Sequence, residues 1–347
     1  MVIVMSSDAS TAEMSAVVRL VEGAGGEAFV SRGVTRTIIG LVGEVEHFEA
    51  LSLRAMPGVA DVMRISTPYK LVSREHHPAR SIIYVGGVPI GPGTVTLIAG
   101  PCAVESYDQM LEAALMARAA GATILRGGAY KPRTSPYAFQ GLGERGLEIL
   151  AEVHEKTGMP TVTEVVNPDD VAKVASFTDM LQIGARNMQN FALLQEVGEV
   201  GMPVLLKRGM AATIEEWLMA AEYIAQRGSL DIVLCERGIR TFETATRNTL
   251  DVAAVPLAQR LAHLPVIVDP SHSGGRRDLV LPLAKASIAS GADGVIVDVH
   301  PHPEIALCDG LQALVPDDMP DLSATVESFA AATCRVVAEP DLQSSLA

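Results

Sequence analysis

The chain has 347 residues, of which 48% are hydrophobic, and this suggests two domains or one large barrel with an appendage. Its net charge of -14 argues against nucleic acid and anionic membranes as partners, because no basic stripe lies outside the candidate sites described below. No apolar run approaches the roughly 20 residues of a membrane helix, and the N-terminus lacks the features of a signal peptide. We therefore expect a soluble, cytoplasmic protein.

Residues 1–72 are expected to form a small domain of their own. Strands are predicted at 2–5, 27–31, 36–41 and 60–65, and helices at 10–22 and 46–55. This βαββαβ order is typical of a ferredoxin-like domain. No catalytic constellation occurs in it.

Residues 73–92 are predicted to form a linker and a β-hairpin. The stretch from Lys70 to Arg80 is charged and contains His and Pro, which suits a linker or a docking segment. The pair His76-His77 could bind a metal, but solvation in a linker explains it more simply. Gly86-Gly87 separates two short apolar runs and indicates a hairpin turn.

Residues 93–338 are predicted to form a (β/α)8 barrel, followed by a frayed tail at 339–347. Short apolar strands alternate with longer helical segments, and such a barrel carries its active site on the loops that follow the strands. The expected strands lie near 94–99, 122–125, 160–163, 180–183, 203–206, 231–234, 265–268 and 293–297. The expected helices include 107–120, 145–157, 168–176, 213–227 and 278–290.

The segment from Arg126 to Pro136 follows the second of these strands and is rich in cations, hydroxyls, glycine and proline. Glycines let the backbone approach an anion, Arg holds phosphate or carboxylate bidentately, and Lys adds a mobile charge. A solvated basic face is the ordinary explanation of such a run. The acidity of the whole chain favours a phosphate site instead.

Polar residues that can bind ligands follow every predicted barrel strand. They are Cys102, Arg126, Glu164, Arg186, Lys207-Arg208, Glu236-Arg237, His272 and Asp298. One such residue could be a helix cap or part of a salt bridge, but a polar residue after each strand indicates a single functional rim.

A metal site is predicted from Cys102, His272, Asp298 and Asp309. A thiolate, an imidazole and two carboxylates suit one divalent ion such as Mn, Fe, Co or Zn better than Mg or Ca. Singly, Cys102 could be a buried small hydrophobe, His272 a turn residue and Asp309 a helix cap. The four cysteines Cys102, Cys235, Cys308 and Cys334 are too scattered for a disulfide framework, and no Cys-x-x-Cys zinc motif occurs, so we expect reduced thiols.

The ordered motifs of the chain resemble the type Iβ family of 3-deoxy-D-arabino-heptulosonate 7-phosphate (DAHP) synthases, which carry an N-terminal ferredoxin-like regulatory domain. The similarity runs to about residue 335. The motifs are Ala99-Gly100-Pro101-Cys102-Ala103-Val104-Glu105-Ser106, the segment 126–136, the segment 183–190, Leu206-Lys207-Arg208-Gly209, Cys235-Glu236-Arg237-Gly238, Asp269-Pro270-Ser271-His272-Ser273 and Asp309-Gly310. Pro132-Arg133-Thr134 is similar to the heptulosonate branch, whereas the octulosonate branch typically carries Asn-Arg-Ser there.

The resemblance implies a transferase that condenses phosphoenolpyruvate with erythrose 4-phosphate to DAHP and phosphate, the first step of the shikimate pathway to aromatic amino acids. By motif match, phosphoenolpyruvate would be bound by Arg126, Lys131, Arg186, Lys207 and Arg237, with Ala185 also in the substrate site. Arg133 and Thr134 would hold the phosphate of the sugar. The metal would polarise the aldehyde, Lys131 would donate a proton, and Glu164 or His272 would handle the proton of the attacking water.

One residue departs from the family pattern. Asp298 stands before Val299-His300-Pro301 where the family has a metal-binding Glu. The carboxylate is shorter by one methylene, roughly 1.5 Å, which is large against a tolerance of about 0.2 Å in metal–ligand distances. This change keeps open a non-catalytic regulatory paralogue. A related enzyme acting on another aldehyde, as an octulosonate 8-phosphate synthase does, is a second alternative, against which Pro132 and Thr134 argue.

The N-terminal domain lacks the ligands that the chemistry needs, so a regulatory role is expected for it. The family resemblance implies feedback by an aromatic amino acid, tyrosine or phenylalanine, and a homotetramer. A passive oligomerisation module is the alternative.

Overall fold

The computed structural model describes residues 1–32, 37–43, 47–48, 51–63, 67–133 and 135–340. The chain divides into two compact units, Met1–Pro68 and Tyr69–Ala347. This division lies a few residues before the boundary expected at residue 72. Of the predicted tail, residues 341–347 lie outside the described part.

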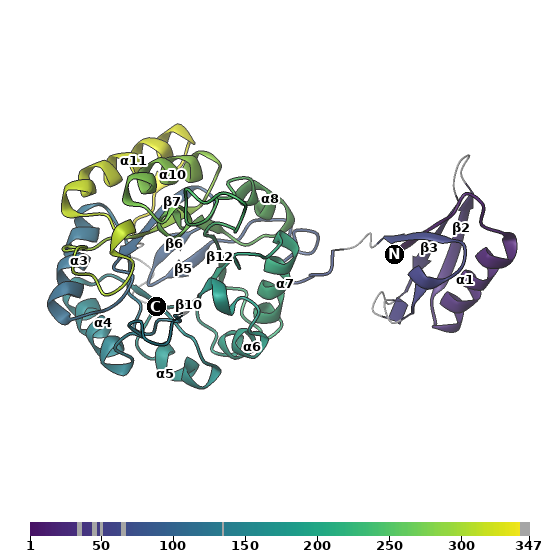
Figure 1. The fold of residues 1–347 in the computed structure, drawn as a ribbon, viewed down its shortest axis with the longest axis horizontal. Coiled ribbons are helices and arrows are strands. Elements are labelled where there is room, and N and C mark those ends of the chain that lie inside the picture. The colour runs from purple at the N-terminus through teal and green to yellow at the C-terminus, as the bar shows by residue number, and fades with distance from the viewer. Residues whose placement is uncertain (33–36, 44–46, 49–50, 64–66, 134, 341–347) are drawn as a thin grey trace. The chain divides into compact units, whose positions relative to one another are not determined.

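The first unit contains a four-stranded antiparallel sheet in the order β2-β3-β1-β4, the strand order of a ferredoxin-like domain (Figure 1). Its elements are β1 (Val2–Met5), α1 (Thr11–Gly23), β2 (Glu27–Arg32), β3 (Thr37–Val42), η1 (Leu53–Ala55) and β4 (Val59–Met63). The predicted ferredoxin-like fold is confirmed. Of the helix predicted at 46–55, residues 46, 49 and 50 lie outside the described residues, and the short turn η1 occupies its end.

Helix α1 begins where its sequence provides a cap. Ser10 and Glu13 form a capping box, in which Glu13 Oε2 accepts from the backbone N–H of Ser10 at 2.7 Å. Val17 and Val21 on the helix pack against Ile3 and Ile39 of the sheet. This apolar layer gives the first unit a core of its own.

The segment that leads into the barrel docks onto it. Glu222 on α7 (Ile214–Ala225) is buried, and its carboxylate accepts the backbone N–H groups of Lys70, Leu71 and Val72 at 2.9 to 3.1 Å. The His77 ring lies 4.3 Å from that of His263, and its Nδ1 lies 2.7 Å from the carbonyl of Ala79. The stretch from Tyr69 onward is therefore part of the second unit, as the docking alternative expected.

The second unit is a closed barrel of eight parallel strands, as predicted, because β14 pairs with β7 (Figure 1). Asp298 at the end of β14 lies opposite Gly100 at the end of β7 in this pairing. The barrel strands are β7 (Thr94–Gly100), β8 (Ile124–Arg126), β9 (Thr161–Glu164), β10 (Met180–Ile183), β11 (Val204–Lys207), β12 (Ile232–Glu236), β13 (Val266–Val268) and β14 (Gly294–Asp298). A two-residue strand, β15 (Val336–Val337), pairs with the first two residues of β7, Thr94 and Val95.

Helices surround the barrel and bury their apolar sides against it (Figure 1). They are α3 (Tyr107–Ala119), α4 (Glu144–Thr157), α5 (Val171–Ala175), α6 (Phe191–Glu199), α7 (Ile214–Ala225), α8 (Ala254–Leu261), α9 (Pro270–Gly274), α10 (Arg277–Ala289) and α11 (Met319–Ala332), with the short turns η2 (Pro168–Asp170), η3 (Ala185–Asn187), η4 (Gly310–Gln312) and η5 (Pro316–Asp318). In the described part of the chain, no helix has the length and apolar character required to cross a membrane.

A hairpin fills the end of the barrel opposite the strand ends that carry the polar residues. Strands β5 (Ile83–Val85) and β6 (Val88–Ile90) are joined by Gly86 and Gly87, which have φ values of 52° and 82° and so form the turn that the sequence predicted. The inward side chains of both strands are buried and pack against residues from all the barrel strands. They close this end of the barrel with an apolar plug.

Candidate active site

A cavity of about 310 Å³ lies at the carboxyl ends of the barrel strands, where the sequence placed the functional rim. Seven of its lining residues are cations: Arg126, Lys131, Arg133, Arg186, Lys207, Arg237 and Arg247. Among the described residues that line it, only Glu164 and Asp309 contribute carboxylates. In a chain with a net charge of -14, this concentration of positive charge indicates a site for anions.

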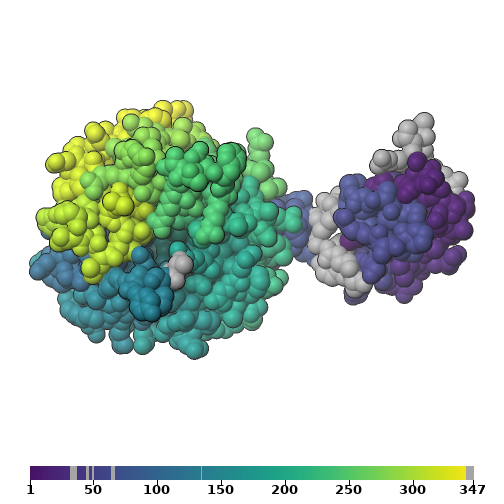
Figure 2. Space-filling view, in the orientation of Figure 1, coloured from purple at the N-terminus to yellow at the C-terminus, as the bar shows by residue number. Residues whose placement is uncertain are grey.

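The loops after the strands supply this lining. Arg126 ends β8, Lys207 ends β11 and Arg186 lies in η3 directly after β10. The segment that follows β8, blue-green in Figure 2, lies on the visible face of the barrel unit beside the yellow-green segment that follows β14. Arg133 joins these two segments through Cys308, with 2.6 Å between Nη1 and Sγ. Thr134, predicted to bind the sugar phosphate, lies outside the described residues.

Arg237 is the clearest sign that the cavity binds an anion. Its side chain is buried, and Nη1 has no hydrogen-bond partner among the residues that the structure describes. Burial also lowers the pKa of Arg237. A buried, unsatisfied guanidinium is costly, and an anionic ligand in the cavity would relieve that cost.

Lys131 points from the same cavity toward Cys102. Its Nζ lies 2.9 Å from the Cys102 carbonyl and 3.1 Å from Sγ. Burial acts to lower the pKa of Lys131, but the Cys102 sulfur and the Glu164 carboxylate outweigh it and raise that pKa above its usual value. The side chain is therefore a charged donor at neutral pH.

Glu164 enters the cavity from β9 and has space because its neighbour is a glycine. A Cβ at Gly184 would lie 2.0 Å from Glu164 Oε1, so a larger residue would displace the carboxylate. Gln182 Nε2 lies 3.4 Å from Glu164 Oε2. Ala185 lines the same part of the cavity, next to Arg186.

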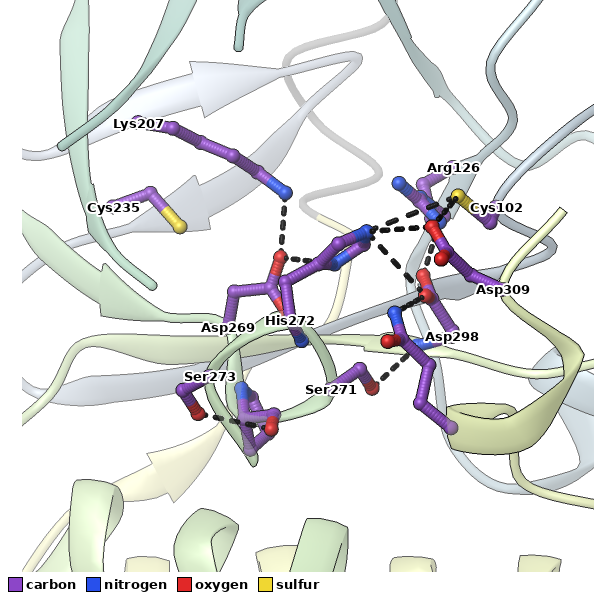
Figure 3. A network of polar contacts seen from close by, with 12 residues as sticks. Cys102, Arg126, Lys207, Cys235, Asp269, Ser271, His272, Ser273, Asp298 and Asp309 are labelled. Carbon is purple, nitrogen blue, oxygen red and sulfur yellow. Dashed lines mark hydrogen bonds and ion pairs between the residues drawn. The ribbon is translucent and has the colours of Figure 1, made fainter. Parts of the chain in front are cut away.

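The four predicted metal ligands gather at one edge of the cavity (Figure 3). Cys102 Sγ lies 3.2 Å from Asp309 Oδ2 and 3.8 Å from His272 Nε2. The same Nε2 lies 3.6 Å from Asp298 Oδ2 and 3.7 Å from Asp309 Oδ2. Cys102, His272 and Asp298 thus form one group of candidate ligands, and Asp309 adjoins it.

A short helix aims the imidazole of His272. Asp269 caps α9 by accepting the backbone N–H of His272 at 2.9 Å, and its Oδ2 lies 2.8 Å from the ring Nδ1 (Figure 3). Nε2 therefore faces Cys102 and the two carboxylates. Burial acts to lower the pKa of His272, but Asp269 and Asp298 raise it to about 10. A site that attracts a proton so strongly also attracts a divalent cation.

Asp298 has partners for both of its oxygens. Oδ1 forms an ion pair with Arg126, and Oδ2 accepts from Gln312 Nε2 at 2.6 Å. Gln312 Oε1 in turn accepts from Arg247 Nη1 at 3.0 Å. Arg126 therefore links the candidate metal ligands to the anion cavity.

The donor atoms fit a metal ion in chemistry and in spacing. Metal–ligand bonds of about 2.0 to 2.3 Å place neighbouring ligand atoms roughly 3 to 4 Å apart, and the four contacts around Cys102 and His272 span 3.2 to 3.8 Å. The mixed sulfur, nitrogen and oxygen set suits Mn, Fe, Co or Zn.

Several residues of the site were not predicted from the sequence: Arg247, Asp269, Gln312 and Cys308. The three-residue spacing from Asp269 to His272 is a signal that could have revealed the capping aspartate. Arg247 and Gln312 sit in long loops, where the sequence gives no spacing to follow.

Two family models match the chain. The model of the DAHP synthetase I family matches residues 71–333, and that of the DAHP synthase ferredoxin-like domain matches residues 1–67. A phospho-2-dehydro-3-deoxyheptonate aldolase of Thermotoga maritima is 54% identical over 314 residues, which cover 90% of this chain and 93% of that protein. A 2-dehydro-3-deoxyphosphooctonate aldolase of Geobacter sp. strain M21 is 33% identical over 266 residues, 71% of this chain and 96% of that protein.

Solved structures are similar to both units. The crystal structure of the Thermotoga maritima DAHP synthase matches with a TM-score of 0.89 and 50% identity, covering 96% of this chain and 98% of that one. A truncated form of the Thermotoga maritima enzyme matches with a TM-score of 0.72 and 53% identity, covering 77% of this chain and 98% of that one.

Proposed function

Because the chain belongs to the DAHP synthetase I family, we propose that its barrel mouth condenses phosphoenolpyruvate with erythrose 4-phosphate to give DAHP and phosphate. The chain is accordingly a transferase that opens the shikimate pathway to aromatic amino acids. The heptonate relative is much more similar than the octonate relative, at 54% against 33% identity, which favours the four-carbon sugar phosphate.

The observation that carries this proposal is the cationic cavity with the buried, unpartnered Arg237 Nη1. Phosphoenolpyruvate brings a phosphate and a carboxylate, and the sugar brings a second phosphate. We assign phosphoenolpyruvate to Arg126, Lys131, Arg186, Lys207 and Arg237, beside Ala185. Arg133 and Thr134 are assigned to the sugar phosphate.

The proposed metal ligands are Cys102, His272, Asp298 and Asp309, with one divalent ion among Mn, Fe, Co and Zn. When bound, the ion would act as a Lewis acid that polarises the aldehyde of the sugar. Asp269 would keep His272 in the required tautomer, because it holds Nδ1 and leaves Nε2 to the site.

The chain's own groups then move the protons. Lys131 Nζ, beside Cys102, is placed to give a proton to the alkoxide that forms as C3 of phosphoenolpyruvate attacks the aldehyde. Water adds to C2, and the resulting hemiketal phosphate loses phosphate. Glu164 is the better base for that water, because His272 Nδ1 lies 2.8 Å from Asp269 Oδ2 and its Nε2 faces the other candidate ligands rather than the open cavity.

A phosphate-release assay tests the function. Purified protein with phosphoenolpyruvate and a divalent metal should release phosphate with erythrose 4-phosphate. Preference for arabinose 5-phosphate would identify an octulosonate 8-phosphate synthase instead, and no release with either sugar would identify a non-catalytic paralogue.

The division of the two anions predicts opposite kinetic effects. Arg133→Ala should raise the KM for erythrose 4-phosphate by about 10-fold or more with little change for phosphoenolpyruvate, and Arg186→Ala should do the reverse, because each loses a charge-assisted bond to one substrate. Steady-state kinetics in both substrates measures this. Arg145→Ala, on the exposed face of α4, is the control. Equal effects on both KM values would show that the assignment is wrong.

The ferredoxin-like unit is proposed as a regulator that binds tyrosine or phenylalanine. It contains a cavity of about 520 Å³ lined by Phe48, Leu53 and Arg54 among others, which combines apolar walls with a cation as an aromatic amino acid requires. An effector acts only through different affinities for two states of the protein, so we propose that the bound amino acid favours a state that binds the substrates more weakly. A homotetramer and a cytoplasmic location are also proposed, the latter because charged sugar phosphates do not diffuse across membranes.

Removing Met1–Pro68 is expected to leave an active barrel that tyrosine and phenylalanine do not inhibit. The cut spares Tyr69 to Val72, whose backbone Glu222 holds, and so leaves the second unit intact. In the full chain the effector should weaken substrate binding by about 5- to 150-fold, the usual range of allosteric coupling. Titrating both amino acids against both proteins measures it. No inhibition of the full chain, or equal inhibition of both proteins, would leave the unit as a passive oligomerisation module.

A further inference from the structure

Cys308 lies at the proposed metal site although the assigned ligands do not include it. Its Sγ is 3.5 Å from Cys102 Sγ and 3.5 Å from Asp309 Oδ2. Both cysteines are almost fully buried, and they pack together with Ala103 and Phe139. Cys102, Cys308 and Asp309 form a second group whose donor atoms are close enough to share an ion.

The backbone at Asp309 is what brings two adjacent side chains to one point. Asp309 has a φ of 53°, in the left-handed region that few residues other than glycine adopt. In an extended chain, successive side chains point to opposite sides. The left-handed turn instead lets both Cys308 and Asp309 approach Cys102. Strain of this kind is retained where the surrounding structure, or a ligand, compensates for it.

The three atoms also have the spacing of metal ligands. Bonds of about 2.3 Å to sulfur and about 2.1 Å to oxygen, at angles between octahedral and tetrahedral, separate two sulfurs by roughly 3.3 to 3.8 Å and sulfur from oxygen by roughly 3.1 to 3.6 Å. The separations of 3.5, 3.2 and 3.5 Å fall within these ranges. A single ion can therefore touch all three atoms.

The shortened carboxylate at position 298 makes a further ligand useful. Asp298 reaches less far than a glutamate, and its oxygens already have Arg126 and Gln312 as partners. Its share in holding an ion is correspondingly weaker. A thiolate from Cys308, 3.5 Å from Cys102 Sγ, would supply an additional bond to the ion.

We propose that Cys308 is a second thiolate ligand of the metal, beside Cys102 and Asp309, and that it biases the site toward softer ions such as Zn and Cd over Mn. This inference rests on the proposed metal site. Arg133 Nη1, 2.6 Å from Cys308 Sγ, can donate to that thiolate while it binds the ion. The residue assigned to the sugar phosphate would then also position a metal ligand.

Counting the sulfur atoms around the ion tests this directly. X-ray absorption on the full chain loaded with Zn should find two sulfur ligands in the unmodified protein and one in Cys308→Ser. Cys334→Ser, whose thiol is exposed and far from this group in the sequence, is the control and should keep two. One sulfur in the unmodified protein overturns the inference, and this measurement does not depend on whether any variant folds.

Competition between metals provides a second readout. Cys308→Ser should lower the affinity for Cd relative to Mn by about 10-fold or more, because a hydroxyl replaces a soft ligand. An unchanged ratio contradicts the inference. A disulfide between Cys102 and Cys308, detected by thiol counting on the metal-loaded protein, would also overturn it. Failure to bind any ion would instead remove the proposed metal site itself, so the two failures are distinguishable.

Discussion

Cys102→Ser is expected to lose at least about 100-fold in affinity for the divalent metal and to have almost no turnover. Loss of residues that only orient a ligand already costs 10- to 100-fold in many metal sites, and Cys102 lies at the centre of the contacts with His272, Cys308 and Asp309. Metal content after dialysis and initial rates at saturating substrate would measure both losses.

The control for this variant is Cys334→Ser, which should keep metal and activity. Exhaustive chelation of the unmodified protein should also abolish turnover, and added Mn, Fe, Co or Zn should restore it. A Cys102→Ser protein with normal metal content, or a chelated protein with undiminished rate, would remove Cys102 from the proposed metal site.

Lys131→Met is expected to lower kcat by roughly 100- to 10,000-fold, the usual contribution of a general acid. The substitution keeps much of the apolar stem but removes the charged donor that lies 3.1 Å from Cys102 Sγ. Metal content should change little, because Lys131 is not a ligand. Stopped-time assays with metal analysis of the same samples would separate the two effects.

Lys173→Met is the matched control, since Lys173 lies on α5 with a half-exposed side chain that pairs with Glu144 on the outer surface. It should leave kcat unchanged. If Lys131→Met kept kcat within a few-fold of the unmodified protein, another group would have to supply the proton.

The barrel could be predicted from the sequence because its strands are short, apolar and separated by helical segments. All eight predicted strands overlap β7 to β14, and the polar residues after them meet at one rim because parallel strands end on the same side. The resemblance added the assignment of that rim to one reaction. The helix boundaries also agree within a few residues, since Ser106 and Thr213 provide recognisable caps for α3 and α7.

Other features could not be predicted, because they depend on contacts between distant segments. Glu222 looks like an ordinary helix residue in the sequence, yet its carboxylate binds the backbone of residues 70–72. The second unit therefore begins at Tyr69, a few residues before the predicted boundary at residue 72. Cys308 approaches Cys102 only because Asp309 adopts a left-handed conformation, which the sequence does not show. The pairing of Asp298 with both Arg126 and Gln312 likewise requires the closed barrel.

The apolar plug formed by β5 and β6 closes one end of the barrel, so small molecules reach the cavity from the other end, where the strands terminate. Reactants and products must then share a single route, and whatever occupies the outer part of the cavity blocks the inner part. Of the residues assigned to phosphoenolpyruvate, Lys207 and Arg237 are buried and Arg186 is exposed, whereas Arg133, assigned to the sugar phosphate, is half-buried. Under that assignment, a sugar phosphate bound at Arg133 hinders access to Lys207 and Arg237, so phosphoenolpyruvate is expected to bind first. An excess of erythrose 4-phosphate should then occupy the outer part of the cavity first, block the entry of phosphoenolpyruvate and slow the enzyme by substrate inhibition.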